Sequence, residues 1–277
     1  MSGSARVVRA GWGTYAALTV ASVVALFPLL WTVVAASHTG GRLAAAPPLL
    51  PGGHLSANLR TAWGEARLGA ALGNSVVVAG SVAAGTVLFS TLAGFAFAKL
   101  RFRGSRALFA VLVGTMLIPQ QACVVPLYLA VARLSWTDRL WAVVLPGLVS
   151  AFGVFFVRQY LVRALPDELV EAARVDGCGT WRLVWHVVFP VARPAMTVLG
   201  LLTFVATWND FLWPMLALTQ IGSPTVQVAL TGLGRGYVPD QGVIMAGSLL
   251  GTAPLLVVFA VFGRRIVGGV MQGAVKG

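Results

Sequence analysis

Charged side chains are scarce in this sequence, and acidic ones are the scarcest of all. Only 10% of the 277 residues are charged and 8 of them are Asp or Glu, whereas 58% are hydrophobic and the mean hydropathy is +0.85. A soluble globular domain carries about 25% charged residues. The composition therefore predicts an integral membrane protein, because a soluble fold would expose large apolar patches. The formal charge of +12 then indicates basic loops at a membrane face, against membrane lipid, and no nucleic-acid partner.

Metal-ligating residues are few as well. The two cysteines, Cys123 and Cys178, form no CxxC pair, and the three histidines, His38, His54 and His186, are isolated in the sequence. These spacings indicate neither a disulfide framework nor a metal site. We expect the histidines to be structural or interfacial, and the chain to bind no metal and no cofactor.

Two kinds of catalytic pattern are missing. No sequence of the type G-x-x-x-x-G-K-[ST], which cradles nucleotide phosphates, occurs in the chain. The apolar segments also lack a Ser/His/Asp or paired-carboxylate constellation, which an intramembrane enzyme would need. We therefore expect that the chain is not an enzyme and does not hydrolyse ATP itself.

Long apolar runs are abundant, and each is a candidate membrane span. A spanning helix needs about 20 mostly apolar residues. We expect an all-α integral membrane protein, because helices satisfy their own backbone hydrogen bonds in lipid. Interior prolines, among them Pro119 and Pro126, predict kinks. The six expected transmembrane helices cover residues 15–36, 76–98, 107–131, 141–162, 194–218 and 243–263.

Lys and Arg between the spans predict the orientation, because cytoplasmic loops carry an excess of them. One set of connecting segments holds most of these residues: Arg6, Arg9, Lys99, Arg101, Arg103, Arg106, Arg158, Arg163, Arg174, Arg182, Arg193, Arg264, Arg265 and Lys276. The other set holds Arg42, Arg60, Arg67, Arg133, Arg139 and Arg235. We therefore expect both termini to be cytoplasmic, in a multi-pass protein of the cell (inner) membrane.

Two connecting loops are longer than a turn requires, and they suggest a division of the chain. The outer loop covers about 37–75 and is rich in proline and glycine, and the inner loop covers 163–193. We expect an N-terminal region with the first span and the outer loop (1–74), a five-helix core that includes the inner loop (75–265), and a cytoplasmic C-terminal tail (266–277).

The inner loop contains a short polar helix with its own start and stop signals. Asp167 and Glu168 suit the positive N-terminal end of a helix, and Arg174 suits the C-terminal end. Gly177 is the expected stop, because glycine takes a positive φ without steric cost. A second helical run, "TWRLVWHVVF", is expected to end at Pro190. The first helix is too short to be stable alone in water, so the protein, a partner, or both must hold it.

The residues alone leave two interpretations of this helix open. It is either a plain surface helix, with a Glu171–Arg174 ion pair worth about a few tenths of a kcal/mol, or a docking helix. In the second case the small Ala172 and Ala173 allow another surface to approach the backbone closely, beside the Glu171 carboxylate.

The spacing of this segment resembles a known motif. Glu171-Ala172-Ala173, three residues, Gly177, nine residues and then Val187-x-Phe189-Pro190 is similar to the EAA loop of ABC importer permeases of the binding-protein-dependent type. That family has Ile and Leu where this chain has Val187 and Phe189, which are conservative departures. Segments from about Asn74 to the C-terminus, among them "AGFAFAKLRFRG", "TWNDFLWPM" and "GAVKG", resemble its carbohydrate branch, similar to the maltose-type inner-membrane permease subunit.

The resemblance implies the permease subunit of a sugar importer. In such a system two permeases, usually different chains, form the pathway, two cytoplasmic ATPase subunits drive it, and an extracytoplasmic solute-binding protein delivers the solute. The EAA helix would be the coupling helix between spans four and five that docks on the ATPase.

The resemblance also implies roles for particular residues. Glu171 would meet a basic group of the ATPase. The tail would reach toward the ATPase as well, although a frayed terminus is the alternative. The residues implied in ATPase docking are Glu171, Ala172, Ala173, Gly177 and Pro190, and those in the tail contact are Val275, Lys276 and Gly277.

Asp210 is the only carboxylate inside the six expected spans. At about 1.5 Å per residue it would lie roughly 24 Å along its helix, in the outer third of a core about 30 Å thick. Intramembrane ionisable groups usually face a cavity or a partner. One interpretation is a pathway or gate, in which Trp208 stacks on a sugar, Asn209 and Asp210 bond hydroxyls, and Gln120 and Gln121 add to the lining. The other is an interhelical hydrogen-bonded pair that locks the packing.

Other functions fit the sequence less well. A secondary transporter usually carries several buried charges and internal repeats, whereas this chain has one buried carboxylate and no evident repeat. A membrane enzyme or scaffold would need catalytic chemistry or a soluble module. Within the importer class a non-sugar solute remains open, because the EAA loop reports the ATPase and not the cargo.

Overall fold

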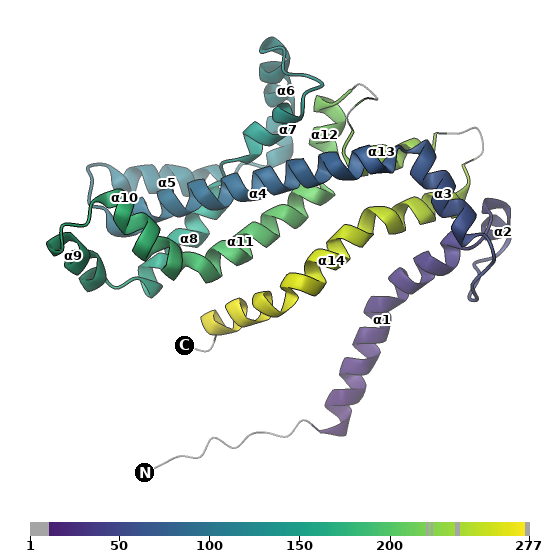
Figure 1. Ribbon diagram of the computed structural model, residues 1–277, viewed down its shortest axis with the longest axis horizontal. Helices are drawn as coiled ribbons and strands as arrows, with labels where there is room; N and C mark the ends of the chain where they lie inside the picture. Colours follow the sequence, from purple (N-terminus) through teal and green to yellow (C-terminus); the bar gives the residue numbers. More distant parts are fainter. Residues whose placement is uncertain (1–10, 220–221, 223, 236–238, 275–277) are drawn as a thin grey trace. The chain divides into compact units, whose positions relative to one another are not determined.

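The computed structural model describes residues 11–219, 222, 224–235 and 239–274, of which 262 and 264–274 are described by their backbone alone. This part of the chain consists of helices and loops and contains no strand (Figure 1). The expected all-α class is therefore confirmed. The helices are α1 (Trp12–Ala36), α2 (Gly40–Ala45), α3 (Leu55–Glu65), α4 (Leu68–Lys99), α5 (Ser105–Thr115), the 3-10 turn η1 (Gln120–Cys123), α6 (Val124–Arg133), α7 (Leu140–Gly147), α8 (Ala151–Ala164), α9 (Asp167–Val175), α10 (Thr180–Leu183), the π-helical turn η2 (Val184–Val188), α11 (Phe189–Asn209), α12 (Leu212–Ala217), α13 (Val226–Gly232) and α14 (Gln241–Ala274).

Within the described residues, 5 helical segments are long and apolar enough to cross a membrane. A sixth crossing requires α5 and the η1–α6 segment to count as one span, although they are bent by 93° relative to one another. The six expected spans thus correspond to five continuous helices and one span that is broken between α5 and η1. The continuous candidates are Trp12–Ala36, Leu68–Lys99, Leu140–Ala164, Thr180–Asn209 and Gln241–Val261.

Pro119 explains where the third expected span breaks. Its backbone is extended (φ −60°, ψ 128°) between α5 and η1. Proline has no N–H to continue the helical ladder, and it restricts the residue before it to extended conformations. The expected kink is therefore a sharp bend, and Gln120 and Gln121 follow it directly.

Pro190 does not end a helix, and this expectation is wrong. The chain is helical without a break from Thr180 through α10, η2 and α11 to Asn209. A proline removes the N–H that bonds the carbonyl four residues back. The π turn of η2 lies directly before α11 and changes the hydrogen-bond spacing there, so the helix continues past Pro190. The fifth expected span, 194–218, is also interrupted, because α11 ends at Asn209 and α12 begins at Leu212.

The chain forms two compact units, whose boundary passes through α14. Unit 1 comprises Met1–Ala66 and Gly232–Leu250, and unit 2 comprises Arg67–Thr231 and Gly251–Gly277. In unit 1, Asn58 of α3 donates from Nδ2 to the carbonyls of Ala36 and His38, both at 2.8 Å. His38 is buried, with its Nδ1 3.0 Å from the Val34 carbonyl. This histidine therefore has a structural environment, as expected.

In unit 2, helices α4, α8 and α11 run side by side (Figure 1). Small residues permit the close approach. A Cβ on Gly94 of α4 would lie 3.0 Å from the backbone nitrogen of Arg158 and 3.1 Å from the Cβ of Val157, both on α8. Thr86 of α4 donates its Oγ1 to the Gly147 carbonyl at 2.9 Å. Small residues and hydroxyl hydrogen bonds are the usual means of packing helices in membranes.

A buried apolar cluster joins α9 to the long helices of unit 2. We call it the α9-end cluster. It draws on α4, α8, α9 and the Thr180–Asn209 helix, so α9 is anchored to three helices that are candidate spans. Its members are Phe95, Val157, Leu161, Leu165, Val170, Leu183, Val184, Val188, Ala192 and Leu199.

Candidate functional site

Helix α9 has the boundaries that the sequence predicts. It runs from Asp167 to Val175, after Pro166 in an extended conformation (φ −61°, ψ 145°). Asp167 and Glu168 occupy the first turn, and Arg174 lies in the last. These charges complement the partial charges at the two helix ends.

The C-terminal end of α9 is a Schellman motif. Gly177 has a positive φ of +70°. Its N–H donates to the Arg174 carbonyl at 3.0 Å, and the Cys178 N–H donates to the Ala173 carbonyl at 2.9 Å. Ala173 and Cys178, the C3 and C″ positions of this motif, both pack against the α9-end cluster. The predicted stop at Gly177 is confirmed.

Replacing Gly177 with alanine is expected to destabilise this end of α9. An L side chain in the left-handed region costs roughly 1–2 kcal/mol, and no clash adds to this because a Cβ here meets nothing within 4 Å. Hydrogen exchange of residues 167–178 in the purified complex should become at least about fivefold faster. Gly179→Ala is the matched control, since Gly179 is equally open but has a φ of −65°. Equal exchange in the two variants would contradict the assignment.

One face of α9 packs against the protein and the other is open. Val170 is buried, and Ala173 is half-buried against the α9-end cluster. Glu171 and Ala172 are exposed, and Val175 is 88% exposed. The two alanines of the motif therefore face different surroundings, because Ala172 lies on the open face and Ala173 contacts the chain's own core.

An ion pair joins the first turn of α9 to the last residue of α4. The Lys99 Nζ lies 2.6 Å from the Asp167 Oδ1, with the Lys99 side chain 7% exposed and that of Asp167 73% exposed. The Lys99 ammonium hydrogen-bonds and attracts this carboxylate, and so holds the pKa of Asp167 below its usual range. The pair is intact at neutral pH, and its contribution is lost only as the pH falls through this lowered pKa. In the described loop, Glu171 and Arg174 form no ion pair within 4.0 Å.

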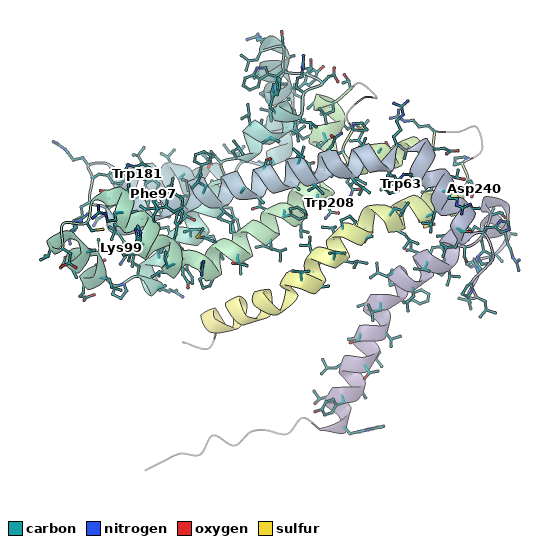
Figure 2. All side chains as sticks on the ribbon, viewed as in Figure 1. Trp63, Phe97, Lys99, Trp181, Trp208 and Asp240 are labelled. Atoms are coloured by element: carbon teal, nitrogen blue, oxygen red, sulfur yellow. The ribbon has the colours of Figure 1, made fainter. Side chains whose placement is uncertain are left out.

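The remaining residues expected to contact the ATPase, Pro190 and the C-terminal tail, lie outside α9. Pro190 is exposed in the first turn of α11, directly after Phe189, whose ring meets that of Trp185 edge to face at 4.6 Å. Figure 2 shows Phe97, Lys99 and Trp181 together at the α9 end of unit 2, away from Trp208. The tail residues Val275, Lys276 and Gly277 lie outside the described residues.

A cavity of about 1090 Å³ lies within unit 2. Gln120 and Gln121 of η1 line it together with Asp210, so the structure brings together three of the expected pathway residues. Val82 and Thr86 of α4 contribute to the wall. Further polar lining residues are Thr115, Ser150, Thr203 and Thr207, and the aromatic ones are Phe152 and Trp213.

Trp208 and Asn209 are not among the described residues that line this cavity. Trp208 is 1% exposed, its Nε1 donates to the Gly251 carbonyl at 3.1 Å, and its ring stacks on Phe204 at 5.7 Å. Asn209 donates from Nδ2 to the Val205 carbonyl at 2.8 Å. The protein therefore encloses the ring of Trp208, which favours a packing role over stacking on a solute.

Asp210 lies in a break between helices. Its backbone is extended (φ −68°, ψ 124°) after the end of α11, and α12 begins two residues later. The expected position of Asp210 in the membrane, about 24 Å along one helix, assumed a single helix through 194–218, and the structure has no such helix. The backbone N–H groups of Trp213 and Leu212, in the first turn of α12, lie near its carboxylate. The same side chain thus lies at the start of α12 and lines the cavity.

Some of the lining could be found from spacing. Leu199, Thr203 and Thr207 of α11 line the cavity at intervals of four residues, which places them on one helix face. Nothing comparable singles out Lys99, because its partner Asp167 lies 68 residues further along the chain.

Comparison with protein families gives one match that covers most of the chain. The family model described as "Binding-protein-dependent transport system inner membrane component" matches residues 86–271. The match includes α9 and all but one of the residues that line the cavity.

Curated relatives extend the similarity over nearly the whole length. The chain is 30% identical over 262 residues to the lactose transport system permease protein LacG of Rhizobium radiobacter, covering 95% of each. It is 33% identical over 259 residues to the sn-glycerol-3-phosphate transport system permease protein UgpE of Shigella flexneri, covering 90% of this chain and 92% of that protein. It is 32% identical over 205 residues to the arabinooligosaccharides transport system permease protein AraQ of Halalkalibacterium halodurans, covering 74% and 73%.

A solved structure has the same fold. It is the crystal structure of a bacterial ABC transporter involved in the import of the acidic polysaccharide alginate, with a TM-score of 0.80 at 21% identity, covering 95% of this chain and 99% of that chain. The chain therefore belongs to the family of binding-protein-dependent transport system inner membrane components, and it is a multi-pass membrane permease subunit of an ABC importer that works with a second permease, an ATPase and a binding protein.

Proposed function

We propose that this permease subunit forms half of the translocation pathway for a neutral sugar or small oligosaccharide. Relatives named for lactose, arabinooligosaccharides and diacetylchitobiose support a carbohydrate cargo. A further relative is named for sn-glycerol-3-phosphate, which is an anion. The choice between a neutral and an anionic cargo therefore depends on the chemistry of the cavity.

The charge of the cavity lining is the observation that carries this proposal. Among the described residues that line it, Asp210 is the one carboxylate, and no Lys, Arg or His is present. Amide, hydroxyl and carboxylate groups bond sugar hydroxyls, and the rings of Phe152 and Trp213 offer apolar faces. A phosphate or carboxylate cargo is normally met by Arg or Lys. An anionic solute is the second candidate, and it would need its cations from the partner permease.

Within this pathway, Asp210, Gln120 and Gln121 are proposed to contact the solute or form its gate. Trp208 is proposed to hold the packing of α11 through its hydrogen bond to Gly251, whereas Asn209 bonds the Val205 carbonyl within α11 itself. Asp210 lies directly before α12, near the backbone N–H groups of Leu212 and Trp213.

The open face of α9 is proposed to be the contact with the ATPase. Glu171 would bond a basic group there, Ala172 allows close approach, and Ala173 and Gly177 hold the helix and its end in place. Pro190 lies in α11, which belongs to the candidate membrane span Thr180–Asn209, and it is proposed to lie at the edge of the contact with the ATPase.

The assembly proposed here contains two ATPase subunits, an extracytoplasmic binding protein and a second permease that is a different chain. Both termini of this chain are cytoplasmic. Residues 1–74 and 75–265 supply the first span and the core, with the EAA loop at 163–193, and residues 266–277 form the tail. Val275, Lys276 and Gly277 contribute a further contact with the ATPase.

Uptake by vesicles that contain the complete complex tests the cargo. ATP-dependent uptake of labelled neutral disaccharides is expected, and Asp210→Asn should lower it about tenfold, because a hydrogen bond to a charged group is worth about 1.5–3 kcal/mol. The control is Glu65→Gln, which removes an exposed carboxylate at the end of α3, and this variant should transport normally. Uptake of sn-glycerol-3-phosphate without any neutral sugar would overturn the proposed cargo.

A further inference from the structure

Helix α4 contacts both the cavity and the helix that is proposed to meet the ATPase. Val82 and Thr86 line the cavity, and Lys99 at the end of the same helix pairs with Asp167 of α9. Thr86 and Lys99 are about 20 Å apart along the helix axis at 1.5 Å per residue. The helix is continuous from Leu68 to Lys99 and contains no proline, so it connects the cavity wall to Lys99 without a break.

We propose that Lys99 is a positioning residue that transmits movements of α4 to α9 through its ion pair with Asp167. This inference rests on the proposed role of α9 as the contact with the ATPase, and it names the link between that contact and the cavity. Val170 and Ala173 hold the middle of α9 by apolar packing, which has little directionality. The ion pair is directional and fixes the first turn of α9 to the end of α4.

Lys99 and Asp167 differ in burial, so removing one partner of the ion pair has a different effect from removing the other. The Lys99 side chain is 7% exposed, so its ammonium is largely withdrawn from water and needs a partner. The Asp167 carboxylate is 73% exposed, so water solvates it if the lysine is lost. Asp167→Asn should therefore do more damage than Lys99→Met, because only the former leaves a buried cation without its counter-charge.

The coupling acts in both directions. A solute that changes the position of α4 changes the presentation of α9, and by linkage a bound ATPase changes the affinity of the cavity. A double-mutant cycle on Lys99 and Asp167 measures this coupling energy.

The test uses the complete complex in vesicles and measures the ratio of ATP hydrolysis with and without solute-loaded binding protein. Lys99→Met is expected to lower this ratio about fivefold, a size typical of interacting neighbours. Asp167→Asn should lower it further, and the double variant should match Lys99→Met. Lys99→Arg should retain the ratio. Arg103→Met, which removes an exposed cation from the loop after α4, is the control and should not change it.

Two results would overturn the proposal. One is a normal ratio in both single variants, and the other is an independent, multiplicative effect of the two substitutions. A wild-type complex that shows no stimulation counts instead against the proposed function. In that case hydrogen exchange of residues 167–175, which needs no solute, measures whether the ion pair holds α9 in place. Exchange that is no faster in Lys99→Met than in the Arg103→Met control would show that the pair does not hold α9.

Discussion

Replacing Glu171 with lysine is expected to lower solute-stimulated ATP hydrolysis by the complete complex at least about tenfold, while membrane insertion stays intact. Glu171 is exposed, and α9 is held from behind by Val170 and Ala173, so the substitution removes no contact inside the chain. It places a like charge against the basic group proposed on the ATPase, which costs several kcal/mol at an interface. The measurement is ATP hydrolysis with and without solute-loaded binding protein.

Two further variants separate charge from structure. Glu171→Gln keeps the shape of the side chain and removes its charge, so an intermediate loss is expected. Glu65→Lys, at an exposed position of α3, reverses a charge outside α9 and should leave stimulation unchanged. Unchanged transport by Glu171→Lys would remove the docking role from this helix.

Replacing Gly94 with leucine is expected to prevent accumulation of the folded permease. The backbone of α8 approaches this position so closely that a Cβ would lie 3.0 Å from the Arg158 nitrogen. The remaining atoms of leucine would overlap further, and a helix backbone cannot rotate aside as a side chain does. Overpacking costs about 1–3 kcal/mol, and more where the backbone is hit. The measurement is the yield of monodisperse complex after solubilisation.

A glycine on the same helix provides the matched control. A Cβ on Gly73 meets nothing within 4 Å, so Gly73→Leu should accumulate like the wild-type protein. Equal yields of the Gly94 and Gly73 variants would show that the α4–α8 crossing is not as close as described.

The helix at the centre of the site could be predicted because its signals are local. The carboxylates of Asp167 and Glu168, the Arg174 side chain and Gly177 all act within one or two turns, and α9 begins at Asp167 and ends where they indicate. The length of the apolar runs likewise predicts the membrane spans, since lipid imposes one requirement on every residue of a run.

The remaining features depend on contacts that no local pattern records. Lys99 and Asp167 are 68 residues apart, and Trp208 is buried against a carbonyl 43 residues away. A proline in the sequence likewise does not by itself predict whether a helix ends there. At Pro119 the chain bends sharply, whereas at Pro190 a preceding π turn carries the helix through. Proline itself has the same low helix propensity at both positions, so the residue alone does not distinguish a bend from a continued helix.

The central claim is that the open face of α9 meets the ATPase, and site-specific photo-crosslinking tests it most directly. A photoreactive amino acid is placed at Val175, which is 88% exposed on α9, or at Leu117, which is 85% exposed after α5. Irradiation of the intact complex should attach the ATPase subunit to the Val175 variant and not to the Leu117 variant. A complex that hydrolyses ATP normally yet gives no ATPase adduct at Val175 would contradict the account.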